Sequence, residues 1–376
     1  MSVGACKNSP FASTLVAALQ AQKPAWHSTT LRVKDAAASL AFYTTNFNMS
    51  LVNEYHCESE SYYFLATLPA AERAALPAPG TADAHSALWN PRAGFGTLGL
   101  AHVHGTEAMA GSDLPLVDHA GRPQLYHNAN SDPRGFGHIA FNTDDVFSAS
   151  EDLEAAGVAF KKRPNEGRMK GLAFCLDPDG YWVELVRREP GTFDPIAERY
   201  NLSQTMIRIK DPAVSVPFFR DVFAMKILSH RVFSDFDLFF SATETVQLAA
   251  AEGAATESVA STKLLWDPCL ELTFNHGTES ADGAAYHNGS DLEYAGGAAP
   301  QGFASISFLV DDIAAFATAL GGAGVTVSDA GAGGLRVCSP TGYWIDVVQR
   351  GRKAFAAPNS ARVSSTRASY TLASRP

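Results

Sequence analysis

A long internal repeat limits the folds that this chain can adopt. The segment TLRVKDAAASLAFYTTNFNMSLV begins at Thr30, and it matches MIRIKDPAVSVPFFRDVFAMKIL, which begins at Met206. The two segments lie 176 residues apart, and the register holds through a strand pattern and the helix pattern that follows it. A match of this length at constant spacing indicates a duplicated structural unit.

Each half of the duplication contains two similar modules. DDVFSASEDLEAAGV from Asp144 matches DDIAAFATALGGAGV from Asp311, and DPDGYWVELV from Asp177 matches SPTGYWIDVV from Ser339. In every module a β-branched strand precedes an amphipathic helix and several short strands. We therefore predict an α+β fold of four β-α-β-β-β modules arranged as two paired domains. Their helices are expected to begin after Asp35, Asp144, Asp211 and Asp311, whose carboxylates suit a helix N-terminus.

The repeat also sets the predicted domain limits. The domains are expected at residues 25–190 and 198–350, which is consistent with a chain of 376 residues. Residues 1–24 form a lead-in. The stretch 351–376 is rich in Ser, Ala and Arg and lacks periodic apolar positions, so we predict a disordered tail.

Composition excludes several classes of partner. A net charge of -10 disfavours nucleic acid, because a phosphate backbone selects clusters of Lys and Arg. The longest apolar runs are far shorter than the ~20 residues of a membrane helix, so no membrane insertion is expected. The five cysteines are widely spaced and never form CxxC, which predicts neither disulfides nor a thiolate metal site. A reducing, cytoplasmic location is expected, with organellar import left open.

Four polar residues recur on the opening and closing strands of modules two and three. His138 in GHIAF and Glu184 in YWVEL belong to module two, whereas Gln204 in SQTMIRI and Glu271 in CLELT belong to module three. Strand alternation turns Glu184 toward the interior, where a carboxylate needs a partner. Each residue taken singly is more often structural. Four of them at equivalent positions indicate a divalent metal site.

The equivalent positions of modules one and four differ. They are occupied by Ser28, Gly99, Ser305 and Asp346. Two serines, a glycine and a shortened carboxylate cannot reproduce a tight octahedral or tetrahedral site. We therefore expect a degenerate second site there and assign the chemistry to modules two and three.

Several long segments resemble glyoxalase I, the lactoylglutathione lyase family of the vicinal oxygen chelate superfamily, in its tandem two-domain form. They are TLRVKD, YHNANSDPRGFGHIAF, GRMKGLAFCLDPDGYWVEL, SQTMIRIKDP, CLELTFNHGTE and YHNGSD. The resemblance covers about residues 25–350. It implies that module two pairs with module three and module one with module four. It also implies one complete site with the metal ligands His138, Glu184, Gln204 and Glu271.

The resemblance further implies a reaction and its substrates. The family isomerises the hemithioacetal of methylglyoxal and glutathione to S-D-lactoylglutathione, with the catalytic carboxylates here being Glu184 for one epimer and Glu271 for the other. The residues that match glutathione-binding positions are Arg208, Asn275, Arg134, Lys162, Gly167, Arg168 and Met169. One divalent metal per chain is implied, with zinc favoured over nickel or cobalt. A monomer is expected because fusion already supplies both modules of the site.

Two alternatives remain open at this point. A ring-cleaving dioxygenase of the same superfamily would use iron held by two histidines and one carboxylate, and this set has a single histidine. A non-catalytic protein that binds glutathione or metal would explain why half of the ligand positions have been lost. The complete set in modules two and three favours the enzyme.

Overall fold

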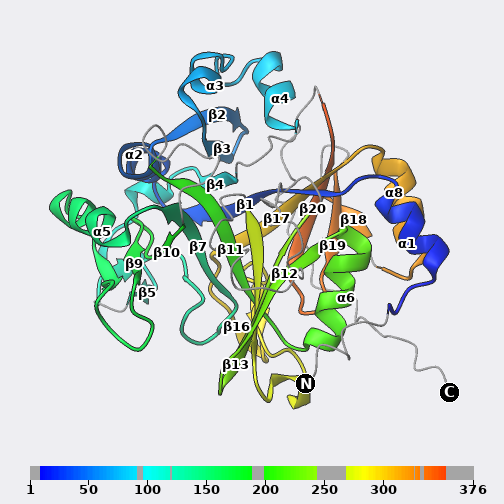
Figure 1. Ribbon diagram of the computed structural model, residues 1–376. Coiled ribbons are helices and arrows are strands. Elements are labelled where there is room, and N and C mark those ends of the chain that lie inside the picture. Colours follow the sequence, from blue (N-terminus) through cyan, green and yellow to red (C-terminus); the bar gives the residue numbers. More distant parts are fainter. Residues whose placement is uncertain are drawn as a thin grey trace.

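Four modules of similar build make up the computed structural model of the chain (Figure 1). The structure describes residues 9–90, 96–118, 121–188, 199–243, 268–325, 327–330 and 334–352. The start of the predicted lead-in and most of the predicted tail, residues 1–8 and 353–376, lie outside the described residues. Within the lead-in, α1 (Ser13–Gln20) precedes the first strand.

The modules of the first half differ mainly by an insertion. Module one contains β1 (Ala25–Val33), α2 (Ala36–Phe47), β2 (Met49–His56), β3 (Glu60–Thr67) and β4 (Thr97–Val103), with α3 (Ala70–Ala74) and α4 (Ala82–Leu88) inserted between the last two strands. A connection follows with η2 (Thr106–Ala108), η3 (Gly111–Asp113), β5 (Leu116–Val117) and β6 (Pro123–Gln124). Module two contains β7 (Phe136–Thr143), α5 (Val146–Ala155), β8 (Phe160–Lys162), β9 (Leu172–Leu176) and β10 (Trp182–Arg187).

The second half repeats this order. Module three contains β11 (Asn201–Ile209), α6 (Pro212–Phe223), β12 (Lys226–Val232), β13 (Phe236–Ala242) and β14 (Cys269–Asn275). The connection contains η4 (Thr278–Ser280), β15 (Glu293–Tyr294) and β16 (Gly297–Ala298). Module four contains β17 (Phe303–Val310), α8 (Ile313–Gly322), β18 (Val327–Asp329), β19 (Leu335–Cys338) and β20 (Trp344–Gln349).

Each eight-stranded sheet takes one module from each half of the chain. The strand order β12-β13-β14-β11-β7-β10-β9-β8 joins modules three and two, and we call this the inner sheet. The order β18-β19-β20-β17-β1-β4-β3-β2 joins modules four and one, and we call this the outer sheet. The predicted α+β fold and the module pairing are confirmed. The domain limits stay a prediction, because both sheets contain strands of both halves.

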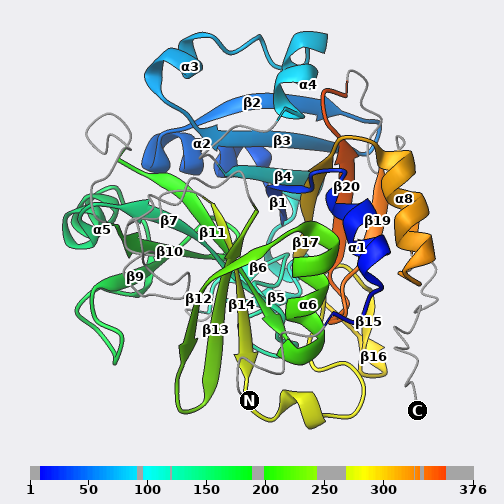
Figure 2. The same ribbon diagram turned by 45° about the vertical axis from the view of Figure 1, so that its right-hand side comes forward.

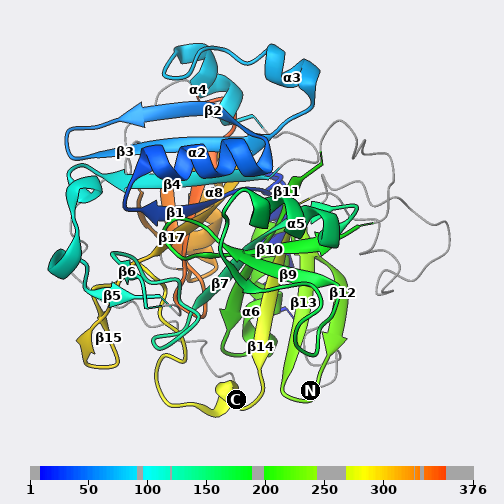
Figure 3. The same cartoon turned by 90° about the vertical axis from the view of Figure 1, so that its left-hand side faces the viewer.

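The helices, in contrast, pack between modules of the same half. Phe47 of α2 stacks on Phe141 of β7, and Phe223 of α6 stacks on Phe308 of β17, each at 4.2 Å between ring centroids. These rings belong to one large core. In Figure 3, α2 lies against the strands of module one, and in Figure 2, α1 lies beside α6 and α8. Among the described residues, no helix is long and apolar enough to cross a membrane.

Aspartates cap the four module helices, although two of the caps were predicted one residue too early. Asp35 and Asp211 accept backbone N–H groups as expected. In the two Asp-Asp pairs the caps are Asp145 and Asp312, not Asp144 and Asp311. The second aspartate of each pair has the extended backbone that lets its carboxylate reach the first free N–H groups. Asp311 instead pairs with Lys23 at 3.2 Å and with Arg350 at 2.6 Å.

Two glycines allow loops of opposite halves to cross. A Cβ atom on Gly135 would lie 2.0 Å from the carbonyl oxygen of His287, and one on Gly302 would lie 2.1 Å from that of His127. At the same crossings the His287 N–H donates to the carbonyl of Arg134, and the His127 N–H donates to that of Gln301, both at 2.8 Å. The PRGFG and PQGFA segments therefore need glycine because another backbone approaches closely.

The DPDG turn of module two buries two carboxylates against module one. Asp177 accepts a hydrogen bond from the Tyr43 hydroxyl at 2.9 Å, and Asp179 accepts one from the Lys34 N–H at 3.0 Å. Burial, together with the charge of Asp179, raises the pKa of Asp177 to about 8. Burial likewise raises the pKa of Asp179. The matching turn of module four carries Ser339 and has no carboxylate at that position.

These raised pKa values predict that the free energy of unfolding decreases between about pH 4 and about pH 8. The folded chain keeps protons that the unfolded chain releases in this range, so a rise in pH favours unfolding by up to about 1.4 kcal/mol per pH unit for each proton. Asp177→Asn should therefore show a shallower pH dependence in urea unfolding than the wild type. Ser339→Ala, the matched control, should keep the wild-type slope, and equal slopes for Asp177→Asn and the wild type would refute the assignment.

Candidate metal centre

Four adjacent strands of the inner sheet bring the predicted ligands onto one face. His138 lies on β7, Glu184 on β10, Gln204 on β11 and Glu271 on β14. Parallel pairing places Glu184 opposite Ala140, and antiparallel pairing places Gln204 opposite the same alanine. Because His138 and Ala140 alternate with Ile139, these registers put the histidine, the amide and the carboxylate on the same side of the sheet.

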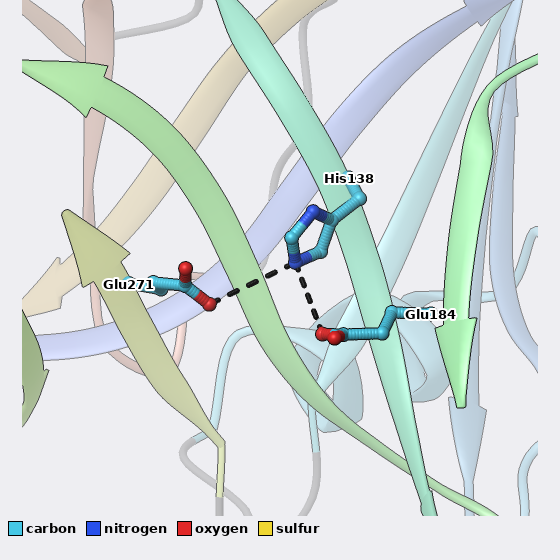
Figure 4. A group of neighbouring side chains, drawn as sticks. All are labelled: His138, Glu184 and Glu271. Atoms are coloured by element: carbon cyan, nitrogen blue, oxygen red, sulfur yellow. Dashed lines mark ion pairs between the residues drawn. The ribbon is translucent and has the colours of Figure 1, made fainter. Parts of the chain in front are cut away.

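The side chains of His138, Glu184 and Glu271 point toward one another (Figure 4). His138 Nε2 lies 3.1 Å from Glu184 Oε2 and 3.7 Å from Glu271 Oε2. Gln204 Nε2 donates to Glu271 Oε2 at 2.5 Å and to Glu184 Oε2 at 3.1 Å. All four residues are only 2–6% exposed. The structure thus brings together every predicted ligand, two of module two and two of module three.

The charges of this cluster suit a divalent cation. Burial lowers the pKa of His138, but the carboxylates of Glu184 and Glu271 outweigh it and raise the pKa to about 9. A proton on the imidazole therefore balances part of the negative charge that the two carboxylates bring into the interior. Ligand atoms of His138, Glu184 and Glu271 lie within 4.8 Å of one another, which is close enough for one metal ion. Rotation of the Gln204 amide would present its oxygen at the same place.

Three predicted glutathione residues lie on or next to the strands that carry the metal ligands. They are Arg208 in β11, Asn275 at the end of β14 and Arg134 just before β7. Arg208, on β11, is buried and donates from Nη1 to three backbone carbonyls at 3.0–3.2 Å. Burial and, after it, the neighbouring Arg134 lower its pKa to about 10. Arg134 itself is exposed. Asn275, at the end of β14, donates to the Tyr286 hydroxyl at 2.7 Å. Two guanidinium groups within electrostatic reach of each other favour an anionic ligand.

The loop after β8 contains the remaining predicted glutathione residues. Gly167, Arg168 and Met169 are exposed on it, and Gly167 has a positive φ of 63°. Lys162, at the end of the strand, donates from Nζ to the carbonyls of Met169 at 2.8 Å and Leu172 at 2.6 Å. Lys162 therefore holds this loop in place, whereas sequence reasoning predicted only a ligand contact for it.

The equivalent face of the outer sheet has no comparable cluster among the described residues. Ser305 donates to Asp346 at 2.7 Å, so these two positions do meet. The Ser28 hydroxyl is buried without a hydrogen-bond partner among the described residues. A Cβ atom on Gly99 would lie 2.6 Å from Thr30 Oγ1, so this position is also closed to a carboxylate.

Comparison with known families identifies the repeat. The model of the Glyoxalase/Bleomycin resistance protein/Dioxygenase superfamily matches twice, over residues 26–185 and over residues 201–347. These two matches cover most of the chain. The chain belongs to this superfamily. A lactoylglutathione lyase of Schizosaccharomyces pombe is 31% identical over 331 residues, which is 86% of this chain and 95% of that protein.

Other members of the superfamily match over much of the chain as well. A glyoxalase I of Saccharomyces cerevisiae is 35% identical over 298 residues, covering 76% of this chain and 78% of its own. Among solved structures, glyoxalase I from Zea mays aligns with a TM-score of 0.55 at 18% identity, over 88% of this chain and 95% of that chain. At this identity the structural likeness supports the fold alone.

Sequence reasoning missed two residues, one beside the inner cluster and one at the equivalent place in the outer sheet. Phe174, opposite Glu184 in the sheet, packs its ring edge against His138 at 5.3 Å. Arg336, opposite Asp346, occupies the corresponding place in the outer sheet and binds that carboxylate. The signal was present, since Phe174 and Arg336 each precede the closing-strand carboxylate by ten residues. The resemblance to glyoxalase I assigns no metal ligand to either position, so the sequence predicted no role for these two residues.

Proposed function

We propose that the protein is a lactoylglutathione lyase, which isomerises the hemithioacetal of methylglyoxal and glutathione to S-D-lactoylglutathione. The observation that carries this proposal is the buried group of His138, Gln204 and the two glutamates between modules two and three. The relative named lactoylglutathione lyase and the relative named glyoxalase I, which both match over most of the chain, support the reaction. The proposed substrates are therefore glutathione and methylglyoxal.

The proposed cofactor is one zinc ion per chain, held by His138, Glu184, Gln204 and Glu271. One imidazole, one amide and two carboxylates are ligands that zinc accepts, and nickel and cobalt accept the same set. When bound, a divalent metal supplies Lewis acidity that stabilises negative charge on the substrate oxygens. The buried position of the four side chains keeps competing water away from that charge.

The two carboxylates are proposed to move the proton between neighbouring substrate carbons. A carboxylate within reach of the C–H bond can take the proton and return it to the adjacent carbon. We assign this role to Glu184 for one epimer of the hemithioacetal and to Glu271 for the other. A product of single configuration requires that the proton reach the neighbouring carbon from one face only, and we assign this delivery to Glu184. For the epimer that Glu271 deprotonates, the proton would first pass from Glu271 through a substrate oxygen to Glu184, so both carboxylates end the cycle deprotonated.

The residues around the cluster are proposed to hold glutathione. Arg134, Arg208 and Asn275 would bind the γ-glutamyl end, since forked guanidinium donors match a carboxylate. Lys162, Gly167, Arg168 and Met169 would bind the glycine carboxylate. Lys162 also donates to the carbonyls of Met169 and Leu172, which orders this loop. A local positive charge of this kind is needed in a chain with a net charge of -10.

A monomer in the cytoplasm is the proposed working form. The strands β7 and β11 pair within one chain, so one copy already contains both modules of the proposed site. The cytoplasm keeps thiols reduced, as a glutathione-dependent reaction requires. The dioxygenase alternative is disfavoured, because the cluster offers one histidine and two carboxylates where that chemistry uses two histidines and one carboxylate.

The decisive assay is formation of the thioester product from methylglyoxal and glutathione. Purified protein supplied with zinc is expected to increase thioester absorbance at a rate proportional to protein concentration. Omitting glutathione, or replacing it with a thiol that lacks the γ-glutamyl and glycine groups, should reduce the rate to background. Protein that binds glutathione but never forms thioester would support the non-catalytic alternative instead.

A further inference from the structure

The outer sheet contains a partly buried ion pair where the inner sheet contains the candidate metal ligands. Arg336 Nε lies 2.7 Å from Asp346 Oδ1, and Arg336 Nη2 lies 3.1 Å from Asp346 Oδ2. Ser305 Oγ donates to the same Oδ2 at 2.7 Å. The side chains of Arg336 and Asp346 are 20% and 14% exposed. A forked guanidinium and a hydroxyl therefore satisfy both oxygens of this carboxylate.

The duplication allows each member of this group to be compared with its counterpart. Asp346 occupies the position of Glu184, and Ser305 occupies that of His138. Arg336 pairs with Asp346 across the sheet as Phe174 pairs with Glu184. The uncharged Phe174 ring gives the inner carboxylates no counter-charge from that strand, and their partners are His138 and Gln204. In the outer sheet the cation is a side chain of the protein.

The surrounding outer positions do not fit a metal ion. Gly99 offers no ligand, and the Thr30 hydroxyl occupies the space that a side chain there would need. Ser28 is too short to take the part of Gln204. The remaining donors, Ser305 and Asp346, are both bound to each other, and Asp346 is also bound to Arg336. A divalent ion would also be repelled by the adjacent guanidinium.

We propose that Arg336 is the resident cation of the outer module pair and takes the place of a metal ion as the counter-charge of Asp346. The ion pair closes this face of β17, β19 and β20 without any cofactor and keeps a second metal ion out. Stacking of the guanidinium near the Trp344 ring, at 5.8 Å, supports its fixed position. This inference concerns the outer sheet and does not depend on the proposed activity.

The electrostatics agree with this role. Burial lowers the pKa of Arg336, but the Asp346 carboxylate more than offsets it and raises the pKa overall. Removing one member of such a pair leaves the other charge partly buried without compensation, whereas removing both leaves two neutral groups. The pair should therefore show strong non-additivity when its members are replaced singly and together.

A double-mutant cycle on the whole protein tests the proposal. Arg336→Met and Asp346→Asn are each expected to lower the midpoint of urea unfolding clearly, and the double variant is expected to lose much less than the two single losses combined. Losses that simply add would overturn the proposal. If the single variants do not fold, a soluble double variant would show the same coupling, and failure of all three would count against it.

Two further measurements make the test specific. The exposed pair of Arg163 and Glu154, whose side chains are 46% and 49% exposed, provides a matched control, and Arg163→Met should change the midpoint little. Arg336→Lys keeps the charge but loses the fork, so its loss should fall between those of the wild type and Arg336→Met. Metal analysis that finds a second tightly bound ion in the wild-type protein would overturn the proposal outright.

Discussion

Replacing Glu184 with glutamine is expected to lower kcat by about a thousandfold. Glutamine keeps the shape of the side chain and an oxygen that can face a metal ion, but it cannot take up a proton. Because we assign the return of the proton to Glu184 for both epimers, neither epimer should escape the loss. The measurement is thioester formation under saturating substrate and excess metal.

The matched control for this variant is Asp346→Asn in the outer sheet. It makes the same carboxylate-to-amide change at the equivalent position, so kcat should stay within about twofold of the wild type below the unfolding temperature. Glu271→Gln should slow the conversion of one hemithioacetal epimer only. Thioester formation by this variant should therefore show a fast phase followed by a slow phase. A Glu184→Gln protein that retained the full rate would remove Glu184 from the catalytic assignment.

Removing the metal should lower activity by roughly a thousandfold, since charge stabilisation by a bound metal is worth several kcal/mol. Dialysis against a strong chelator, followed by titration with zinc, nickel or cobalt, measures both the loss and the metal that restores the rate. Recovery of the rate should be complete after about one ion per chain. The chain has a single proposed site, which uses one histidine, one glutamine and two glutamates. The four ligand types accept all three metals, so the ranking has to be measured.

Matched variants in the inner and outer sheets show which sheet binds the metal in this experiment. His138→Ala should bind metal weakly and stay inactive at any metal concentration. The variant loses the imidazole, which is the one histidine ligand of the described cluster. Ser305→Ala, at the equivalent outer position, should behave like the wild type in metal content and rate. Full activity in chelated protein would contradict the proposed mechanism and leave only a binding function.

Much of the fold and of the candidate site could be predicted from residue patterns. The duplication at constant spacing required repeated modules, and strand alternation placed Glu184 toward the interior. The residues at equivalent strand positions then separated a complete ligand set from a degenerate one. In the structure His138, Glu184, Gln204 and Glu271 do lie together. Such periodic features depend on local backbone geometry, which neighbouring residues largely determine.

Other features depended on contacts between distant segments. The anion contact of Lys162 stays a prediction, whereas the hydrogen bonds from its Nζ to the carbonyls of Met169 and Leu172 came only from the structure. The sequence prediction placed two helix caps one residue before their true positions, Asp145 and Asp312. The end of the preceding strand decides which aspartate of a pair has the extended backbone of a cap. Gly135 and Gly302 are explained only by the loops that cross them.

The sequence by itself determined the number and order of the modules and which residues could bind a metal. Side-chain type and periodicity carry that information along the chain. Only the tertiary structure decided that Arg336 neutralises Asp346 in the outer sheet, while the inner carboxylates share His138 and Gln204. The physical reason is that a buried charge must find its partner in space. Which partner it finds depends on the strand that pairs beside it.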